Sequence, residues 1–284
     1  MDFTNSQRAA ILVEALPYIE KYYNQIIVVK YGGNAMIDQN LKKSVMKDIV
    51  LLSTIGIKVV LIHGGGPEVT GLLKQVGKES EFVNGLRVTD KETADYVQMV
   101  LAGKVNKSLV NIIGSYGGNA IGLSGIDGQM IKATMQDEAL GYVGEVTEVN
   151  PKIILDVLEK GYIPVISTVG CDEEGNVYNI NADTAAAEIA GALQSQVLIS
   201  MTDISGVMRD VNDPDSLISK ITLKELEELK ASGVISGGMI PKVDCCAHAL
   251  NCGAKKVFII DGRKEHSIIM EMLTDEGMGT MFVK

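Results

Sequence analysis

Short apolar runs alternate along this chain with longer amphipathic runs, and this alternation constrains the fold more than any other feature. The strand-like runs cover residues 26–31, 58–62, 119–123, 162–166, 196–201, 256–260 and 280–283, and the helical runs cover 39–53, 67–76, 90–114, 182–193, 266–273 and a segment starting at Pro151. Such alternation is typical of βαβ units, whose parallel strands lie side by side in one sheet. We therefore predict an α/β protein with a central, mostly parallel sheet.

Two further features organise the chain around that sheet. No internal repeat or low-complexity linker separates detached domains, so we expect two lobes that share one continuous sheet and divide near residue 195. Residues 129–149 alternate β-branched and polar positions, broken by Gly141 and Gly144. This pattern predicts a hairpin over one end of the sheet, which could act as a lid. A second hairpin is expected to end near residue 178.

The composition excludes several classes of function. The 284 residues are 46% hydrophobic and 22% charged, an ordinary profile for a soluble globular protein. A net charge of −10 and a pI near 4.9 argue against a nucleic-acid surface, which needs clustered lysine and arginine. No apolar run approaches the roughly 18 residues of a membrane span, and residues 1–10 lack the order of a signal peptide. We expect a cytoplasmic protein that binds neither nucleic acid nor membrane.

The cysteines and histidines show no familiar metal or disulfide pattern. They are Cys171, Cys245, Cys246, Cys252, His63, His248 and His266. None of the cysteines forms a CxxC pair, and none of the histidines belongs to a HExxH motif. We therefore expect reduced structural thiols and no dedicated zinc site.

Two glycine-rich turns follow predicted strands. The strand over 26–31 carries its only charge at Lys30 and is followed by Gly32 and Gly33. The second strand is followed by the three glycines 64–66. Backbone N–H groups in such turns can approach an anion closely, because glycine has no Cβ. We expect a phosphate or carboxylate there, although one turn of this kind is equally compatible with a plain strand-to-helix connection.

Two familiar nucleotide-binding motifs are absent. A P-loop would need a glycine upstream of Gly103-Lys104 and a Ser or Thr after it, but Val105 follows. A dinucleotide fingerprint would need GxGxxG after the first strand, and neither turn supplies it. The glycine cluster 122–128 reads as a turn into the predicted hairpin. A nicotinamide oxidoreductase is therefore disfavoured.

Three later segments place polar groups at strand ends or helix starts. Residues 179–183 lead into a helix, with Asn181 as the expected N-cap and a carboxylate in the first turn. Residues 202–206 follow a strand at the carboxyl edge, where open α/β sheets bind ligands. Lys242 stands near the start of another helix, after Gly237-Gly238. Its charge opposes the helix dipole there, so a bound anion is expected beside it.

Six motifs, in their order along the chain, resemble those of the amino acid kinase family, and more narrowly those of the N-acetylglutamate kinases. They are KYGGNAM, IHGGGPE, NGLRVT, NINAD, TDISGV and GGMIPK, and the resemblance extends from Ile26 to Lys284. It implies a three-layer αβα sandwich of the carbamate kinase-like type. It also implies ATP- and Mg²⁺-dependent phosphorylation of the γ-carboxylate of N-acetyl-L-glutamate to N-acetyl-L-glutamyl 5-phosphate, a step of arginine biosynthesis.

The same resemblance implies roles for particular residues. Lys30 and Lys242 would neutralise the transferred phosphoryl group, Asp183 would hold both lysines in position, and Gly33 and Gly65 would offer backbone N–H groups. The residues implied to contact the acetylated amino acid are Gly65, Gly66, Arg87 and Asn179. Those implied to border the ATP adenosine are Asp203, Ile204, Ser205, Gly206, Val207, Met208, Val234, Ile235 and Ser236. Mg²⁺ would be held mainly by the ATP phosphates, without protein ligands.

A carboxylate acceptor explains why no catalytic histidine or serine is needed. A glutamate side chain has a pKa of about 4.3, so the acceptor is ionised at neutral pH and requires no general base. What remains is to align two anions and to supply fixed positive charge. Arg87 suits the α-carboxylate, because a guanidinium can donate two parallel hydrogen bonds.

The two ends of the chain carry expectations about assembly and regulation. Residues 1–25 read as an amphipathic helix that either packs on its own domain or joins neighbouring subunits. In the resemblance, such a helix marks the arginine-inhibited members, which are hexamers built as trimers of dimers. The residues that resemble their arginine-binding signature are His266, Glu276, Gly277 and Gly279. We expect residues 1–25 to serve oligomerisation and regulation, 26–195 substrate binding and dimerisation, and 196–284 ATP and arginine binding.

Other functions remain open at this point. A kinase of the same fold could act on aspartate, glutamate, carbamate or UMP, although NGLRVT and NINAD favour N-acetylglutamate. A protein that senses arginine or acetylglutamate without catalysis is a further alternative. The presence of Lys30, Lys242 and Asp183 together argues against such a sensor.

Overall fold

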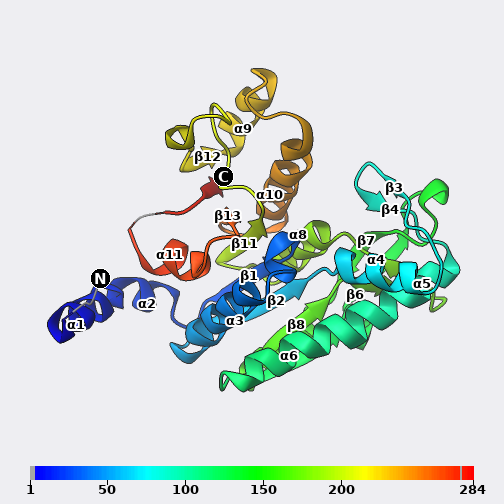
Figure 1. The fold of residues 1–284 in the computed structure, drawn as a ribbon, viewed down its shortest axis with the longest axis horizontal. Helices are drawn as coiled ribbons and strands as arrows, with labels where there is room; N and C mark the ends of the chain where they lie inside the picture. Colours follow the sequence, from blue (N-terminus) through cyan, green and yellow to red (C-terminus); the bar gives the residue numbers. More distant parts are fainter. Residues whose placement is uncertain (1–3, 276) are drawn as a thin grey trace.

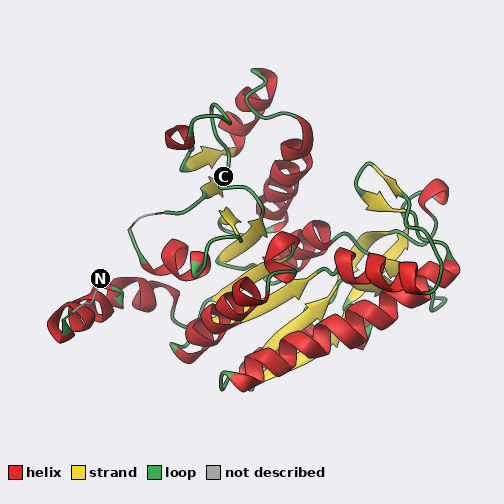
Figure 2. Cartoon of the chain, viewed as in Figure 1, coloured by secondary structure: helices red, strands yellow, loops and turns green. Residues whose placement is uncertain are grey.

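The computed structural model of the chain describes residues 4–275 and 277–284 and contains a central eight-stranded sheet (Figure 1, Figure 2). Its strands, in spatial order, are β12 (Lys220–Thr222), β14 (Thr280–Val283), β13 (Val257–Asp261), β11 (Val197–Thr202), β1 (Ile26–Tyr31), β2 (Lys58–His63), β8 (Ile163–Ser167) and β5 (Ala120–Ser124). All neighbouring pairs are parallel except β13 with β14. The predicted α/β class with a mostly parallel sheet is confirmed.

Helices cover both faces of this sheet and give the chain three layers (Figure 1). On one face lie α3 (Gln39–Thr54), α4 (Gly66–Gln75), α6 (Asn106–Ser115) and α11 (Ser267–Leu273). On the other lie α7 (Lys152–Glu159), α8 (Ala182–Ala192), α9 (Leu223–Ala231) and α10 (Ile240–Cys252). Ile27 and Val29 of β1 pack into the first layer and Val28 into the second. A strand buried on both faces needs apolar residues throughout, which explains the continuous apolar runs.

Smaller sheets flank the central one. A four-stranded sheet contains β10 (Val177–Asn179), β9 (Val169–Cys171), β6 (Ile131–Met135) and β7 (Gly144–Val149), and a ribbon contains β3 (Phe82–Val83) and β4 (Leu86–Arg87). The antiparallel pairs β6–β7 and β9–β10 confirm the two predicted hairpins. Asn84 and Gly85 join β3 to β4 with φ of 50° and 81°, as a two-residue Asn-Gly turn requires.

The helical run predicted over 90–114 is present, but it is not a uniform α-helix. It consists of α5 (Lys91–Gln98), the π-helical segment η2 (Met99–Val105) and α6. Asp90 caps its start by accepting a hydrogen bond from the N–H of Thr93 at 2.7 Å. The short 3₁₀ segments elsewhere are η1 (Gly33–Met36), η3 (Asp127–Gln129), η4 (Glu138–Leu140), η5 (Pro214–Ser216) and η6 (Gly237–Met239).

The N-terminal segment forms two helices where one was predicted over residues 1–25. They are α1 (Asn5–Glu14) and α2 (Leu16–Tyr22). Pro17 stands in the first turn of α2, and α1 cannot continue through it because proline lacks an N–H and clashes with the preceding turn. No residue of α1 is buried, whereas Tyr22 is 4% exposed and belongs to the core. Within the described residues, no helix has the length and apolar character needed to cross a membrane.

Candidate active site

Lys30 and Asp183 form an ion pair where β1 meets the start of α8. Lys30 is 7% exposed, and its Nζ lies 2.9 Å from Oδ1 of Asp183. Ser200, the register partner of Lys30 in β11, donates a hydrogen bond to the same oxygen from 3.4 Å. The side chain of Asn181 accepts hydrogen bonds from the N–H groups of Asp183 and Thr184, so the predicted N-cap is confirmed. This cap fixes the turn that presents the carboxylate to Lys30.

Lys242 joins this pair from the other half of the chain. It lies in the first turn of α10, and α10 packs against α8. A small cavity of about 10 Å³ is lined by Lys30, Asp183, Ala186, Leu198, Ser200, Lys242, Cys245 and Cys246. Burial acts to raise the pKa of Asp183, but Lys30 and then Lys242 outweigh it and hold that pKa below its ordinary value. The structure thus brings the two predicted lysines together around one ionised aspartate.

The glycine-rich turns lie beside this cluster, at the carboxyl ends of β1 and β2. Gly33 has a φ of 67°, and a Cβ there would come within 2.6 Å of Oδ1 of Asp203 in the loop after β11. A Cβ on Gly64 would lie 3.5 Å from Cβ of Ala182, so the second turn reaches the start of α8. Gly65 follows as the residue before α4. Both turns therefore present backbone at the edge where such sheets bind ligands.

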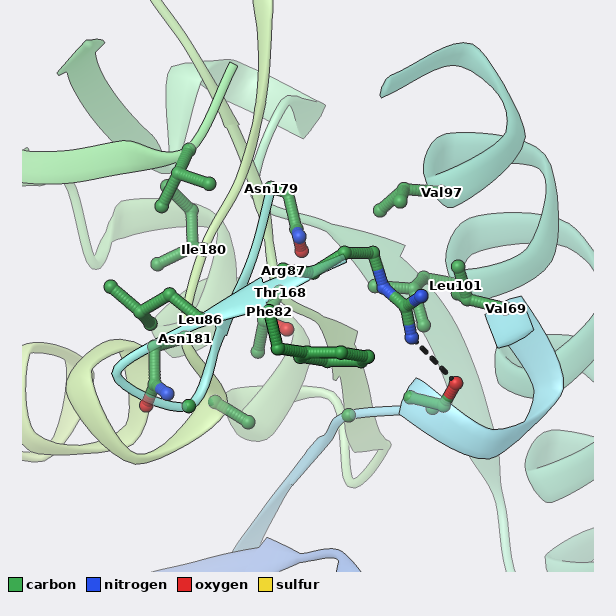
Figure 3. A pocket seen from close by; sticks show the side chains of 16 residues that line it. Val69, Phe82, Leu86, Arg87, Val97, Leu101, Thr168, Asn179, Ile180 and Asn181 are labelled. Atoms are coloured by element: carbon green, nitrogen blue, oxygen red, sulfur yellow. Dashed lines mark hydrogen bonds between the residues drawn. The ribbon is translucent and has the colours of Figure 1, made fainter. Parts of the chain in front are cut away.

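A pocket of about 200 Å³ opens next to the second turn (Figure 3). It is lined by Gly64, Gly65, Gly66, Val69, Phe82, Gly85, Leu86, Arg87, Val97, Leu101, Val143, Thr168, Asn179, Ile180, Asn181 and Ala182. Four of these residues were predicted to bind the acceptor, namely Gly65, Gly66, Arg87 and Asn179. The structure brings them together, and the pocket borders Ala182, which precedes Asp183 in the chain.

The guanidinium of Arg87 is held firmly on one side of the pocket. Its Nη2 donates to the carbonyl oxygen of Gly66 at 2.9 Å, dashed in Figure 3, and to Oγ1 of Thr70 at 2.8 Å. Its Nη1 donates to Oγ of Ser80, and Cζ of Arg87 lies 4.7 Å from the ring centroid of Phe82. Three of five N–H donors thus bind described residues, which leaves two for a ligand. Burial lowers the pKa of Arg87, but the pKa of a guanidinium is so high that the side chain stays charged.

Asn179 is coupled to Arg87 through a threonine. It is the last residue of β10, and its Nδ2 donates to Oγ1 of Thr89 at 3.3 Å. Oγ1 of Thr89 in turn donates to the carbonyl oxygen of Arg87 at 2.7 Å. The N–H of Asn179 bonds to the carbonyl of Tyr142 at 2.9 Å. These bonds link the amide of Asn179 to the backbone of Arg87, and the two side chains lie on neighbouring walls of one pocket (Figure 3).

The residues predicted to border the adenosine lie in two loops of the C-terminal half. Residues 203–208 follow β11, and residues 234–236 precede α10. Val207 and Ile235 are 1% and 2% exposed and belong to the same apolar cluster, so only their backbone can reach a ligand. Gly206, with φ of 141°, lets the N–H of Val207 bond to Oγ1 of Thr280 at 2.9 Å. Packing of these side chains keeps the two loops together.

His266, the first residue predicted to bind arginine, serves the contact between α11 and α3. It precedes α11 with a φ of 58°, and its Nδ1 lies 2.6 Å from Oδ1 of Asp48 in α3. Its backbone N–H donates to Oγ of Ser44 at 3.0 Å. Burial raises the pKa of Asp48 to about 6. The left-handed backbone at His266 is stabilised by this pair of contacts.

The other predicted arginine residues lie beyond the opposite end of α11. The carboxylate of Glu271 accepts hydrogen bonds from the N–H groups of Met278 at 2.7 Å and Gly279 at 3.1 Å. Gly277 lies beside the same carboxylate, and Glu276 lies outside the described residues. Helix α11, seven residues and about 10 Å long, lies between His266 and these glycines in the chain. A shared role of His266, Gly277 and Gly279 in binding arginine stays a prediction.

Three residues in or next to the site were not predicted from the sequence. Phe82 stacks on Arg87, Ser200 bonds to Asp183, and Asn106 donates to Nε2 of the buried His63 at 3.1 Å and to the carbonyl of Val165 at 2.8 Å. Burial lowers the pKa of His63 to about 4, so this imidazole is neutral. The sequence carried a signal for two of them. Ser200 is a serine within an apolar strand, and Asn106 is an asparagine on a buried helix face.

The arrangement has the parts of a small-molecule kinase. Lys30 and Lys242 line one cavity, and their ammonium groups can supply fixed positive charge to a phosphoryl group. Arg87 supplies a carboxylate-binding group in the neighbouring pocket. Fold and site together define a kinase for a small anionic acceptor.

Sequence relatives narrow this class to one family. Residues 25–261 match the family model described as the amino acid kinase family. The acetylglutamate kinase of Brachyspira hyodysenteriae is 53% identical over 285 residues, covering 100% of this chain and 99% of that protein. Further acetylglutamate kinases are 50 to 52% identical. The chain belongs to the acetylglutamate kinases within the amino acid kinase family, as the motifs predicted.

Solved structures confirm the fold. The N-acetylglutamate synthase of Neisseria gonorrhoeae, complexed with coenzyme A and N-acetyl-glutamate, superposes with a TM-score of 0.83 at 25% identity, covering 97% of this chain and 63% of that chain. The carbamate kinase of Giardia lamblia bound to AMP-PNP superposes with a TM-score of 0.67 at 18% identity, covering 92% and 99%. The predicted carbamate kinase-like sandwich is therefore confirmed.

Proposed function

We propose that this chain transfers the γ-phosphoryl group of ATP to the γ-carboxylate of N-acetyl-L-glutamate, giving N-acetyl-L-glutamyl 5-phosphate for arginine biosynthesis. The observation that carries the proposal is the meeting of Lys30, Asp183 and Lys242 beside the Arg87 pocket. Similarity to acetylglutamate kinases over the whole chain supports the same acceptor. The four cysteines are free thiols, which suits a reaction in the cytoplasm.

The proposed chemistry depends on charge and alignment. The acceptor carboxylate attacks the γ-phosphorus directly, since it is already ionised at neutral pH. Lys30 and Lys242 stabilise the charge on the transferred group, and the N–H groups of Gly33 and Gly65 add hydrogen bonds. Mg²⁺ carried by the ATP phosphates supplies further positive charge there. Asp183 is already engaged by Lys30 and Ser200, so its proposed role is to position the lysines.

The pocket supports an acetylated acceptor over a free amino acid. An N–H donor of Arg87 that the described residues do not use suits the α-carboxylate, and apolar side chains such as Val97 and Leu101 suit the acetyl methyl and the methylenes. None of the described residues that line the pocket is acidic. A free α-ammonium group would therefore lose its hydration without gaining a counter-charge.

A coupled assay of ADP release with MgATP tests the proposal. We expect kcat/KM for N-acetylglutamate to exceed that for glutamate, aspartate, carbamate and UMP by about a hundredfold or more, because a mismatched acceptor leaves buried polar groups unpaired. Faster turnover of another acceptor would assign the chain to that reaction. Binding of acetylglutamate without ADP release would support a sensor.

We further propose that L-arginine inhibits the reaction from a cavity of about 650 Å³ between the N-terminal helices and α11. It is lined by Ile11, Leu12, Glu14, Ala15, Tyr18, Ile19, Leu51, Ile55, Ile269, Met270, Leu273, Thr274, Asp275 and Met278. Glu14 and Asp275 offer carboxylates for a guanidinium, and Tyr18 donates a hydrogen bond to Asp275. Met278 connects the cavity to the loop of Gly277 and Gly279.

The exposed face of α1 supports an oligomeric protein. Ile11, Leu12 and Val13 are 50%, 74% and 69% exposed, and Leu16 of α2 is 51% exposed. A group of exposed apolar side chains of this kind is typical of a surface that another subunit covers. We propose that residues 1–25 of neighbouring dimers meet through this face and build a hexamer from three dimers.

A further inference from the structure

Helices α8 and α10 approach each other closely at Gly191 and Cys252, away from their first turns. A Cβ added to Gly191 of α8 would lie 2.4 Å from Cβ of Cys252 in α10. Only glycine permits the two backbones to come so near. Three side chains with metal-binding atoms converge beside this contact, namely Glu188 from α8 and His248 and Cys252 from α10.

The ligand atoms of these side chains are already close together. Nε2 of His248 lies 2.6 Å from Oε1 of Glu188 and 3.4 Å from Sγ of Cys252. The three ligand atoms all lie within 4.8 Å of one another. Bond lengths of about 2.0 Å to nitrogen or oxygen and 2.3 Å to sulfur place tetrahedral ligands roughly 3.3 to 3.6 Å apart. The observed spacings are already close to these values.

The chemistry of the three atoms selects a class of metal. We propose that Glu188, His248 and Cys252 bind one divalent cation of the zinc class between α8 and α10. One carboxylate oxygen, one imidazole nitrogen and one sulfur match the ligand types of Zn²⁺, and three protein ligands leave a fourth position for water. Coordination replaces the thiol proton of Cys252, which is released to solvent.

Tertiary packing assembles this site from residues that no sequence motif groups. His248 and Cys252 are four positions apart and so share one face of α10. Glu188 is sixty residues earlier along the chain and reaches the pair only because α8 packs on α10. The sequence predicted no zinc site because that prediction was based on local motifs. A local motif does not include a residue as distant in the chain as Glu188.

The bound cation would tie together the two helices that carry Asp183 and Lys242. Glu188 follows Asp183 by five residues and His248 follows Lys242 by six, distances of about 7.5 and 9 Å along the helix axes. A metal bridge here would fix the separation of α8 and α10 without touching the reacting groups. The site is thus separate from the Mg²⁺ that ATP brings.

Titration of the full chain with Co²⁺, in the absence of nucleotide, tests this site. We expect one Co²⁺ per chain, with the visible bands of tetrahedral cobalt and a near-ultraviolet thiolate band, and displacement by Zn²⁺. The variants Cys252→Ser, His248→Ala and Glu188→Gln should each weaken Co²⁺ binding by at least about tenfold. Cys252→Ser should also abolish the thiolate band. The matched controls Cys171→Ser and His266→Gln should bind as the unmodified chain does.

Thermal unfolding gives a second measurement that does not depend on activity. Zn²⁺ should raise the Tm of the unmodified chain and of both controls, since a ligand that binds only the folded state stabilises it. The three site variants should unfold near the metal-free Tm with or without Zn²⁺. Absence of the thiolate band in the unmodified chain, or its retention in Cys252→Ser, would overturn the proposal and leave His248 and Glu188 as a surface ion pair.

Discussion

At the scale of single residues, the site depends on one carboxylate that stays charged while buried. Burial alone would favour protonation of Asp183, but Lys30 and Lys242 hold its pKa below the ordinary value. Asp183 therefore stays charged at every pH at which the acceptor carboxylate is ionised. The aspartate in turn keeps two ammonium groups close together that would otherwise repel each other.

Removal of either lysine should abolish most of the activity. We expect Lys30→Ala and Lys242→Ala each to lower kcat by on the order of a hundredfold or more, as loss of a preorganised donor does in other enzymes. Lys160→Ala, at an exposed position after α7, is the matched control and should leave kcat unchanged. Steady-state kinetics with N-acetylglutamate and MgATP measures the effect. Normal turnover in both active-site variants would rule out the proposed mechanism.

At the scale of elements, two helix contacts determine the geometry around the site. α8 and α10 meet at Gly191, and this contact sets how Asp183 and Lys242 face each other. α3 and α11 meet at Asp48 and His266, on the opposite face of the sheet. The first contact depends on close packing, and the second on a buried charge.

The Gly191→Ala substitution should push α8 and α10 apart. Its Cβ would overlap Cys252, and overpacking of this kind costs about 1 to 3 kcal/mol of unfolding free energy. Gly114→Ala in α6 is the matched control, because a Cβ there meets no atom within 4 Å. The control should keep or gain stability, since alanine favours a helix over glycine. Urea denaturation compares the two variants, and equal stabilities would contradict the close contact.

The buried Asp48 should make stability depend on pH in an identifiable window. Burial raises its folded-state pKa to about 6, whereas an unfolded aspartate has a pKa of about 3.9. Between these values the folded state binds more protons, so stability falls as pH rises from about 4 to 6 and then stays level. We expect Asp48→Asn to gain on the order of 2 kcal/mol over the unmodified chain across this window. Urea denaturation at pH 4.5 and pH 7 measures the gain, and a difference independent of pH would contradict it.

At the scale of the whole molecule, the N-terminal helices differ in their attachment. α1 has no buried residue, whereas Tyr22 at the end of α2 packs into the core. Gln25 also accepts a hydrogen bond from the N–H of Lys58 at 3.0 Å, next to β2. α1 can therefore be removed without opening the core, and α2 cannot.

Deletion of residues 1–14 should separate assembly from catalysis. We expect the intact chain to sediment as a hexamer and the truncated chain as a dimer, because the exposed apolar face of α1 is lost. Inhibition by arginine should weaken, since Ile11, Leu12 and Glu14 line the proposed cavity. Turnover with acetylglutamate should be retained. A dimeric intact chain in analytical ultracentrifugation would exclude the proposed hexamer.

Local patterns were sufficient for much of the fold. The apolar runs located seven of the eight strands of the central sheet. They missed β12, because a strand of only three residues leaves too short a pattern. The Asn181 cap was also predictable, because an N-cap depends on neighbours within three residues. The π-helical segment was missed because it depends on packing against distant residues. The break before Pro17 was missed because the apolar periodicity continues across the proline.

By itself, the sequence determined the order of most strands and helices, the family and the identity of the charged residues, since these depend on local periodicity and on motifs. Only the tertiary structure decided which of those residues meet. It packed Phe82 on Arg87, linked Ser200 to Asp183, and set Glu188 beside His248 and Cys252. The physical reason is that contacts between residues far apart in the chain are set by how the layers pack, and no local pattern records that packing.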